Sequence, residues 1–360
     1  MIKIGAFTVP IGLRLGTPEQ TNRDLIEWDL QVARWADAAG LSEIFFAEHF
    51  TIGHEPSPAP ELMIAAASRE TSSITLGSLG HLLPYHNPIA LAHRILWLDH
   101  MTGGRYICGV APGAFPTDNQ LFATGKSNPA MFDEALEIIL AICRRTDPFT
   151  ITGEFWTVDM PAYSEAWHGP HLRPYRAAGI PFAVTGASAR SASFTTAAKN
   201  GVLPVSSQIA VPILREQWAH YENASHAYGR NPSRADWRIS RDIVVADTDR
   251  EARELAVRGG LGRTWREIQL PTFRAMNMLS SFTGGAIPDS DVTDEWIIDN
   301  LMIVGSPDTV VAKIERLYED VGGFGGLVSI VYDETLQPER CEHSIKLLGT
   351  EVAPRLGALG

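Results

Sequence analysis

The feature that most constrains the fold is a repeated alternation of short apolar runs with longer stretches whose apolar residues recur every three or four positions. The apolar runs cover residues 3–7, 42–47, 74–83, 105–110, 181–184, 201–205, 238–245 and 326–331. The helical patterns that follow them cover residues 25–39, 61–69, 90–100, 131–144, 189–199, 211–228, 250–257 and 309–319, and a last one starts at 339. Strands that are apolar throughout are buried on both faces, which indicates a parallel sheet.

Eight strand–helix units predict an α/β fold, a closed (β/α)8 TIM barrel in which residues 1–360 form one domain. An open doubly wound sheet is the alternative, but the first strand–helix turn carries no GxGxxG fingerprint. Two segments interrupt the alternation and are expected to be insertions, at about 147–180 and 261–296. The first includes an alternating stretch typical of a hairpin, at 149–158. The second is expected to be a lid, or else to pack at a dimer interface or on the outside of the barrel.

Net charge and cysteine content indicate which partners and which cellular compartment to expect. A net charge of −12 argues against nucleic acids and anionic membranes as partners. The three cysteines, none in a CxxC spacing, fit a reducing compartment. We find neither a signal-peptide pattern nor an apolar run approaching the roughly 20 residues of a membrane span. The sequence therefore predicts a cytoplasmic protein.

The second apolar run ends in a pair of residues that is out of place in a core. The stretch SEIFFAEHF, residues 42–50, passes from buried-strand residues directly to Glu48 and His49. Parallel barrels carry their chemistry beyond the carboxyl ends of the strands. An acid and an imidazole at this place therefore indicate a functional site. The alternative is that Glu48 and His49 are two exposed loop residues without a function.

Other strand ends suggest a site for a flat, phosphorylated ligand. Residues 185–193, TGASARSAS, are a hydroxyl-rich turn that opens a helix, where free amides, the helix dipole and Arg190 would favour a phosphate. An ordinary Ser/Thr N-cap is the alternative. Residues 77–80 and 109–113 are poor in side chains, which suits a flat ring lying on the backbone or simply tight packing. Together these features are what FMN would need.

Metal catalysis is not expected, because the eleven histidines include no HExxH or facial-triad spacing and no cysteine pair supports them. Cys108 lies inside an apolar run and is expected to be an inert buried thiol.

Five motifs carry a resemblance to a known family. They are AEHF (47–50), GSLGHLLPYHNP (77–88), GRYICGVAPGAF (104–115), VTGAS…S (184–193) and VGSPDTV (304–310). In this order they resemble the bacterial luciferase-like flavin monooxygenases, and most closely the branch of diketocamphane and limonene monooxygenases, which includes type II Baeyer–Villiger enzymes. The resemblance spans essentially the whole chain. It implies reduced FMN supplied by a separate reductase, molecular oxygen as the second substrate, and a homodimer.

The resemblance also implies roles for particular residues. His49 would be the active-site histidine and Glu48 its acidic neighbour. Leu79 and Gly80 would lie under the flavin ring, where the family often has a non-proline cis peptide. The expected flavin wall comprises Ala111, Gly113 and Phe115, and the expected phosphate and ribityl contacts are Thr185, Arg190, Ser191, Ala192, Ser193 and Ser206. The expected substrate pocket comprises Phe7, Phe50, His81, Phe273 and Met276.

The chain departs from luciferase at three of these positions. Phe50, Ala111 and Pro112 stand where luciferase has a second histidine, a cysteine and an arginine. These departures argue against light emission and an aldehyde substrate, and favour a cyclic ketone or a terpenoid. His49 is expected to stabilise or protonate the peroxide formed from reduced FMN and oxygen, or to hold the substrate oxygen. Two alternatives are a deazaflavin-dependent oxidoreductase on the same barrel and a flavin-binding protein without catalysis.

Overall fold

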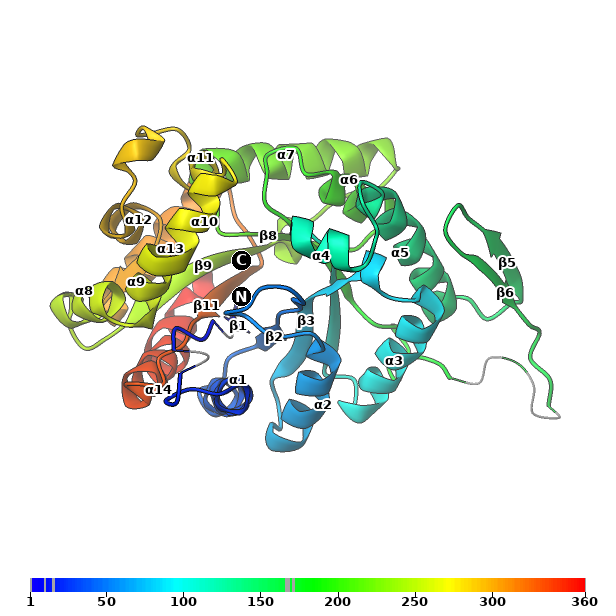
Figure 1. Ribbon diagram of the computed structural model, residues 1–360, viewed down its shortest axis with the longest axis horizontal. Helices are drawn as coiled ribbons and strands as arrows, with labels where there is room; N and C mark the ends of the chain where they lie inside the picture. The colour runs from blue at the N-terminus through cyan, green and yellow to red at the C-terminus, as the bar shows by residue number, and fades with distance from the viewer. Residues whose placement is uncertain (1, 10, 15–16, 166–168, 170–171, 360) are drawn as a thin grey trace.

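The computed structural model describes residues 2–9, 11–14, 17–165, 169 and 172–359. Within them, eight parallel strands close into a barrel, because the last strand pairs back with the first (Figure 1). In barrel order these are β1 (Lys3–Thr8), β2 (Glu43–Phe46), β3 (Thr75–Leu82), β4 (Tyr106–Ala111), β7 (Phe182–Gly186), β8 (Leu203–Ser206), β9 (Arg238–Val245) and β11 (Gly326–Val331). The predicted closed barrel is confirmed, and the open sheet is not formed.

Helices surround the barrel, as Figure 1 shows. The outer ring comprises α1 (Asn22–Ala38), α2 (Pro60–Glu70), α3 (Pro88–Met101), α5 (Asn128–Arg144), α6 (Ala192–Asn200), α7 (Val211–Ala227), α8 (Asp249–Arg258), α13 (Pro307–Val321) and α14 (Pro338–Leu347). Local chemistry sets several helix starts. Thr21 and Asp24 form a capping box at α1, and prolines occupy the first turn of α2, α3, α5, α7, α13 and α14.

Side chains on the strands alternate between two separate apolar layers. A small cluster fills the barrel interior and comprises Phe45, Leu79, Ile107, Ala183, Val205 and Val328. The residues next to them, such as Phe46 and Cys108, pack outward against the helices. The predicted buried state of Cys108 is confirmed, and burial raises the pKa of its thiol. This alternation decides which residues beyond the strand ends turn toward the barrel axis.

The first interruption forms an antiparallel hairpin of β5 (Phe149–Thr152) and β6 (Thr157–Met160), which confirms the predicted hairpin. It projects beyond α5 at the edge of the molecule (Figure 1). The carboxylate of Glu134 on α5 holds its turn by accepting the backbone N–H groups of Glu154, Phe155 and Trp156, at 2.6–3.1 Å. Residues 166–168 and 170–171 of the expected insertion lie outside the described residues.

The second interruption is a set of short helical turns. They are α9 (Gly260–Thr264), a π-helical turn (Trp265–Gln269), α10 (Leu270–Ala275), α11 (Leu279–Thr283) and α12 (Asp294–Asn300), followed by β10 (Ile303–Gly305). Strand β10, which the sequence did not predict, pairs with the end of β9. Trp265 and Phe282 pack with Val9, Ile11 and Tyr332, which follow β1 and β11. The segment therefore covers the barrel end beside these two strands. None of the described helices is long and apolar enough to cross a bilayer.

Candidate active site

A cavity of about 290 Å³ lies at the carboxyl ends of β2, β3, β4, β7 and β8. This volume is close to the lower end of the range for small-molecule sites, about 300–1,000 Å³. Its lining comprises Glu48, His49, Leu79, Gly80, Leu82, Ala111, Pro112, Gly113, Ala114, Phe115, Thr185, Gly186, Ala187, Ser191, Ser193 and Ser207. Ten of the predicted site residues belong to this lining, and they come from four different strand ends.

His49 turns its ring toward this cavity. The ring stands edge-on to Phe115, with 5.3 Å between the ring centres. Its Nδ1 atom is buried and has no hydrogen-bond partner among the described residues. Its Nε2 atom lies 3.4 Å from Oε1 of Glu55. An imidazole with one nitrogen beside a carboxylate and the other unpaired is suited to donating or accepting a proton.

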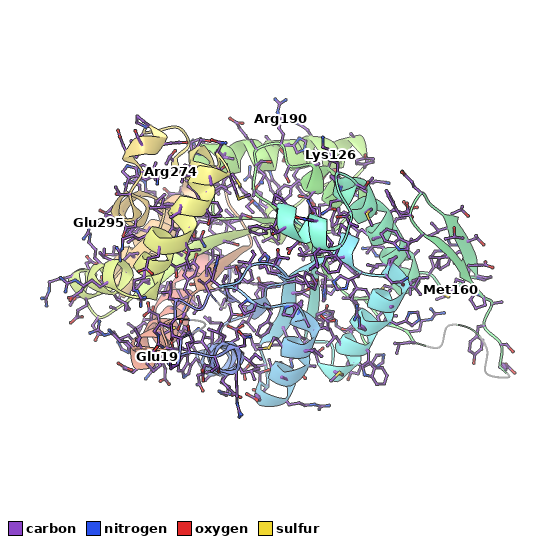
Figure 2. The ribbon with its side chains drawn as sticks, in the orientation of Figure 1. Glu19, Lys126, Met160, Arg190, Arg274 and Glu295 are labelled. Atoms are coloured by element: carbon purple, nitrogen blue, oxygen red, sulfur yellow. The ribbon has the colours of Figure 1, made fainter. Side chains whose placement is uncertain are left out.

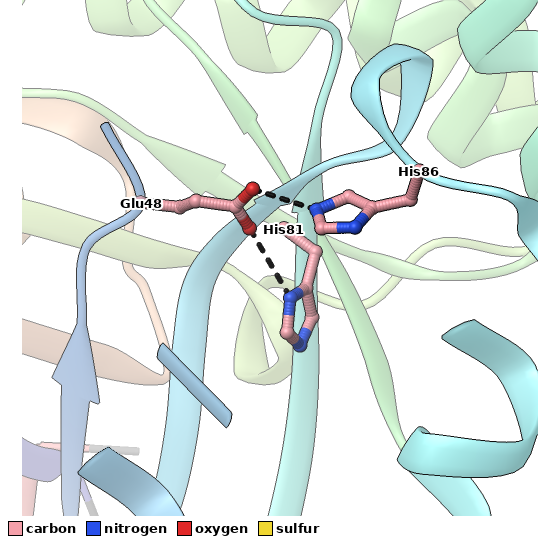
Figure 3. Close-up of side chains that lie close together, drawn as sticks. All are labelled: Glu48, His81 and His86. Carbon is pink, nitrogen blue, oxygen red and sulfur yellow. Dashed lines mark hydrogen bonds and ion pairs between the residues drawn. The ribbon is translucent and has the colours of Figure 1, made fainter. Parts of the chain in front are cut away.

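Glu48 turns the other way and binds two histidines (Figure 3). Its Oε1 accepts the Nε2–H of His86 at 2.6 Å, and its Oε2 lies 3.3 Å from both Nδ1 of His81 and the backbone N of Leu82. Burial alone would raise the pKa of this carboxyl, but the hydrogen bonds from His81 and His86 outweigh it and lower the pKa to about 2. Glu48 therefore holds residues 81–86 against the end of β2.

The same three side chains are close enough together to hold a metal ion. However, each ring already has a complete set of hydrogen bonds if both histidines are neutral. Nε2 of His81 lies 3.4 Å from the hydroxyl of Tyr106, which can donate to it, and Nδ1 of His86 accepts from Arg94 at 3.3 Å. The protons then sit on the nitrogens that face Glu48. Because a metal would need the lone pairs of those same nitrogens, we interpret the cluster as a hydrogen-bonded brace.

Neighbouring residues of an extended chain project to opposite faces, which explains why Glu48 and His49 separate. The side chain of Glu48 projects to the same side of the chain as Phe46, at the edge of the cavity lining. His81 also points outward, toward Tyr106, and its side chain is completely buried. It does not line the cavity, in contrast to its expected place in the substrate pocket.

The other end of the cavity carries hydroxyl groups. Thr185 is the last but one residue of β7, Ser191 is the N-cap residue of α6, and the hydroxyls of Ser191 and Ser193 lie 2.7 Å apart. The first amides of a helix lack partners within the helix, so this end can bind an anion. Ala192 is exposed and does not line the cavity, although it begins α6.

Two expected phosphate contacts lie elsewhere. Arg190 is exposed and extends away from the molecule, as Figure 2 shows. Ser206 is buried on the outer side of β8, where it donates to Gln217 and accepts from Nε1 of Trp237 at 2.8 Å. Gln217 in turn donates to the backbone oxygen of Ser188 at 2.8 Å. Ser206 therefore supports the loop that carries the hydroxyl groups.

Part of the cavity wall consists of backbone and small side chains. The peptide bond between Leu79 and Gly80 is cis, as the resemblance implied. A Cβ atom at Gly80 would lie only 2.7 Å from the backbone N of Val110, so glycine is needed for β3 to pack this closely on β4. Ala111 and Gly113 continue this wall at the end of β4.

The remaining expected pocket residues do not line the cavity. Phe50 packs against Phe122, with 4.7 Å between the ring centres, and Phe7 contacts the cluster inside the barrel. Phe273 packs on Phe282 at 4.5 Å within the covering segment, and Met276 is exposed.

Comparison with known proteins agrees with this arrangement. The sequence model of the luciferase-like monooxygenase family matches residues 9–323. The chain belongs to this family. Among its relatives, 2,5-diketocamphane 1,2-monooxygenase 1 of Pseudomonas putida is 33% identical over 99% of both chains. Limonene 1,2-monooxygenase of Rhodococcus erythropolis is 32% identical over 93% of this chain and 83% of that protein.

A solved structure extends the likeness to three dimensions. The oxygenating constituent of 3,6-diketocamphane monooxygenase from Pseudomonas putida, a type II Baeyer–Villiger monooxygenase in complex with FMN, has a TM-score of 0.91 and 30% sequence identity. The match covers 99% of this chain and 98% of that one. The predicted relationship to the diketocamphane and limonene branch of the luciferase-like family is therefore confirmed.

Two functional candidates in this luciferase-like monooxygenase were missed from the sequence. Ser207 lines the cavity where Ser206 was expected, and the period-2 alternation from the inward-facing Val205 would have identified it. Glu55 is the acid that lies beside His49, where Glu48 was expected. No periodic signal leads to Glu55, because it lies in the irregular loop after β2.

Proposed function

We propose that this protein is the oxygenase component of a two-component monooxygenase. It takes reduced FMN from a separate reductase and uses molecular oxygen to oxygenate a small hydrophobic molecule, such as a cyclic ketone or a terpenoid. The relatives that oxygenate diketocamphane and limonene support this substrate class. For a ketone, the proposed reaction inserts one oxygen atom beside the carbonyl and releases the other as water.

The observation that carries the proposal is the pairing of an apolar, backbone-rich wall with a hydroxyl-rich helix start in one cavity. Ser191, Ser193 and the first amides of α6 would hold the phosphate of FMN, and Leu79, Gly80 and Ala111 would face its ring. When bound, reduced FMN supplies the electrons that activate oxygen. The unpaired, buried Nδ1 of His49 fits this arrangement, since such an atom needs a partner that the ligands would provide.

The side chains of the chain itself bind, exclude water and move a proton. Leu82 and Phe115 add apolar surface to the cavity, which would keep bulk water away from the reacting atoms. His49 is placed to exchange a proton at Nδ1 or to donate a hydrogen bond to the substrate oxygen. Glu48 contributes indirectly, because it holds the segment that follows Gly80.

The test combines the protein with a flavin reductase, NADH, FMN, ¹⁸O₂ and a panel of bicyclic and monocyclic ketones and terpenes. We expect FMN to bind and one ¹⁸O atom to appear in the product by mass spectrometry. The proposal fails if the protein has no affinity for FMN in either redox state. It also fails if a deazaflavin binds in preference to FMN and substrate is converted without oxygen uptake.

Ser191 allows a direct test of the phosphate end. We expect Ser191→Ala to weaken FMN binding about tenfold, because it removes one hydrogen bond to a charged group, worth about 1.5–3 kcal/mol. Fluorescence titration of FMN measures the effect. Ser188→Ala is the matched control, since Ser188 lies in the same loop with an exposed side chain that does not line the cavity. Equal FMN dissociation constants for the two variants would show that Ser191 does not bind the phosphate.

A further inference from the structure

The loop after β2 folds back on itself and returns to His49. His49 and Ser57 form an antiparallel bridge, in which the backbone N–H of His49 donates to the oxygen of Ser57 at 2.8 Å. The hydroxyl of Ser57 donates to the oxygen of Ala47 at 2.8 Å, and the N–H of Ser57 donates to the oxygen of Glu55 at 3.0 Å. The backbone therefore fixes Glu55 beside His49.

The carboxyl of Glu55 is almost completely buried, with 9% of its side chain exposed. Among the described residues, the one basic group within ion-pair distance is His49, whose Nε2 is 3.4 Å away. The other titratable groups that interact electrostatically with this pair are Asp29 of α1, His54 of the same loop and Tyr332 beyond β11. Burial raises the pKa of the Glu55 carboxyl and His49 opposes this rise. A buried carboxylate needs such a partner, so the contact with His49 stabilises its charged form.

We propose that Glu55 is the positioning residue of His49, holding the ring proton on Nε2 and leaving the lone pair on Nδ1, the ring nitrogen that has no partner among the described residues. The separation of 3.4 Å is slightly long for a hydrogen bond and within the range of an ion pair. Glu55 does not line the cavity, so it acts through the imidazole and not on the substrate.

This arrangement assigns a separate role to each nitrogen of the His49 ring, one beside a carboxylate and one without a partner among the described residues. A neutral imidazole has one N–H and one lone pair, and a carboxylate beside one nitrogen decides which is which. With the proton on Nε2, the lone pair of Nδ1 accepts a proton from bound substrate or water. When the ring is protonated, Glu55 stabilises the positive charge and Nδ1–H donates. The inference rests on the proposed role of His49, but the tautomer can be measured without any turnover.

The test uses protein with ¹⁵N-labelled histidine rings, and His49→Asn assigns the resonances. In the wild type, we expect a fixed Nε2–H tautomer of His49. Glu55→Leu, which removes the acceptor, should give averaged Nδ1 and Nε2 resonances and about a tenfold lower kcat with KM nearly unchanged. Glu55→Gln keeps an acceptor oxygen and should retain the tautomer and part of the activity. Glu61→Gln is the control, because Glu61 is a mostly buried carboxylate that pairs with Arg94.

A wild-type tautomer and wild-type kcat in folded Glu55→Leu would overturn the inference. If Glu55→Leu does not fold, the wild type decides: the His49 Nε2 proton should exchange slowly with water at neutral pH, and fast exchange would also overturn it. These readouts separate the two proposals. A fixed tautomer that depends on Glu55, in a protein without FMN affinity, would reject the proposed function and leave this inference standing.

Discussion

Replacing His49 with asparagine lowers the rate of oxygenation about a hundredfold and leaves FMN affinity within about twofold of the wild type. The imidazole is the titratable ring on the cavity wall, and a positioned acid–base group typically contributes about 10²–10⁴-fold to a rate. Asparagine keeps a polar side chain of similar length but cannot exchange a proton near neutral pH. Because one fifth of the His49 side chain is already exposed, the change should cost little stability.

The rate is measured by ¹⁸O incorporation into product in single turnovers, and FMN affinity by fluorescence titration. His93→Asn provides a matched control, since His93 is exposed on α3 and bonds only the backbone oxygen of Ile89. An oxygenation rate of His49→Asn equal to that of the control would remove His49 from the proton-transfer step. A parallel loss of FMN affinity would instead indicate that the ring is part of the flavin wall.

Replacing Glu48 with glutamine destabilises the fold by about 3 kcal/mol and weakens FMN binding. The carboxylate faces three donors, the rings of His81 and His86 and the backbone N–H of Leu82. Glutamine offers one acceptor oxygen and turns an N–H toward buried N–H groups, each of which costs about 1–3 kcal/mol when unpaired. The segment from Gly80 to His86 loses its attachment to β2, and the flavin wall loses its shape. Urea denaturation measures the free energy of unfolding.

Glu70→Gln is the control for this variant, because Glu70 pairs with Arg34 at the surface, where an ion pair contributes about 0–1 kcal/mol. The pH dependence gives a second check. The pKa of Glu48 is lowered from 4.5 to about 2, so its contribution is complete above about pH 4.5 and is lost as the pH falls through about 2. The difference corresponds to about 3 kcal/mol, and this part of the acid destabilisation should be missing in Glu48→Gln. If Glu48→Gln lost as much stability on acidification as the wild type does, this part of the loss would not come from Glu48.

Periodic local signals accounted for most of the barrel. The predicted strands at 238–245 and 326–331 match β9 and β11 to the residue, and the other six differ by at most two residues at either end. A run that is buried on both faces is recognisable from its own composition, and a helix from its apolar stripe. Strand β10 was missed because three residues are too few to show a period. The helical turns of the segment 261–296 are five or six residues long, which is also too short to show a helical period.

Ten of the predicted site residues line one cavity at the strand ends, whereas others lie on the opposite side of the chain. His49, Leu79 and Thr185 line the cavity as expected. Ser206 is one residue away from Ser207, which lines the cavity, and points into the outer layer. His81 lies two residues after the inward-facing Leu79, so strict alternation would turn it inward as well. It points outward where the pairing of β3 with β4 shifts register between Ser78 and His81. A motif places a functional position within a residue or two, whereas the alternation of a strand sends its neighbour to the opposite face.

The sequence by itself determined the eight-stranded barrel and predicted a candidate site with His49 at the carboxyl ends of its strands, because these depend on local periods and on residue types at strand ends. Only the tertiary structure decided what the acid and the imidazole in SEIFFAEHF each contact. Glu48 and His49 are adjacent in the chain but project to opposite sides, so Glu48 binds His81 and His86 while His49 faces the cavity. The carboxylate beside His49 comes from Glu55, because a bridge between residues 49 and 57 folds the loop back. Such a return has no periodic signature, since it depends on contacts between residues that no local pattern connects.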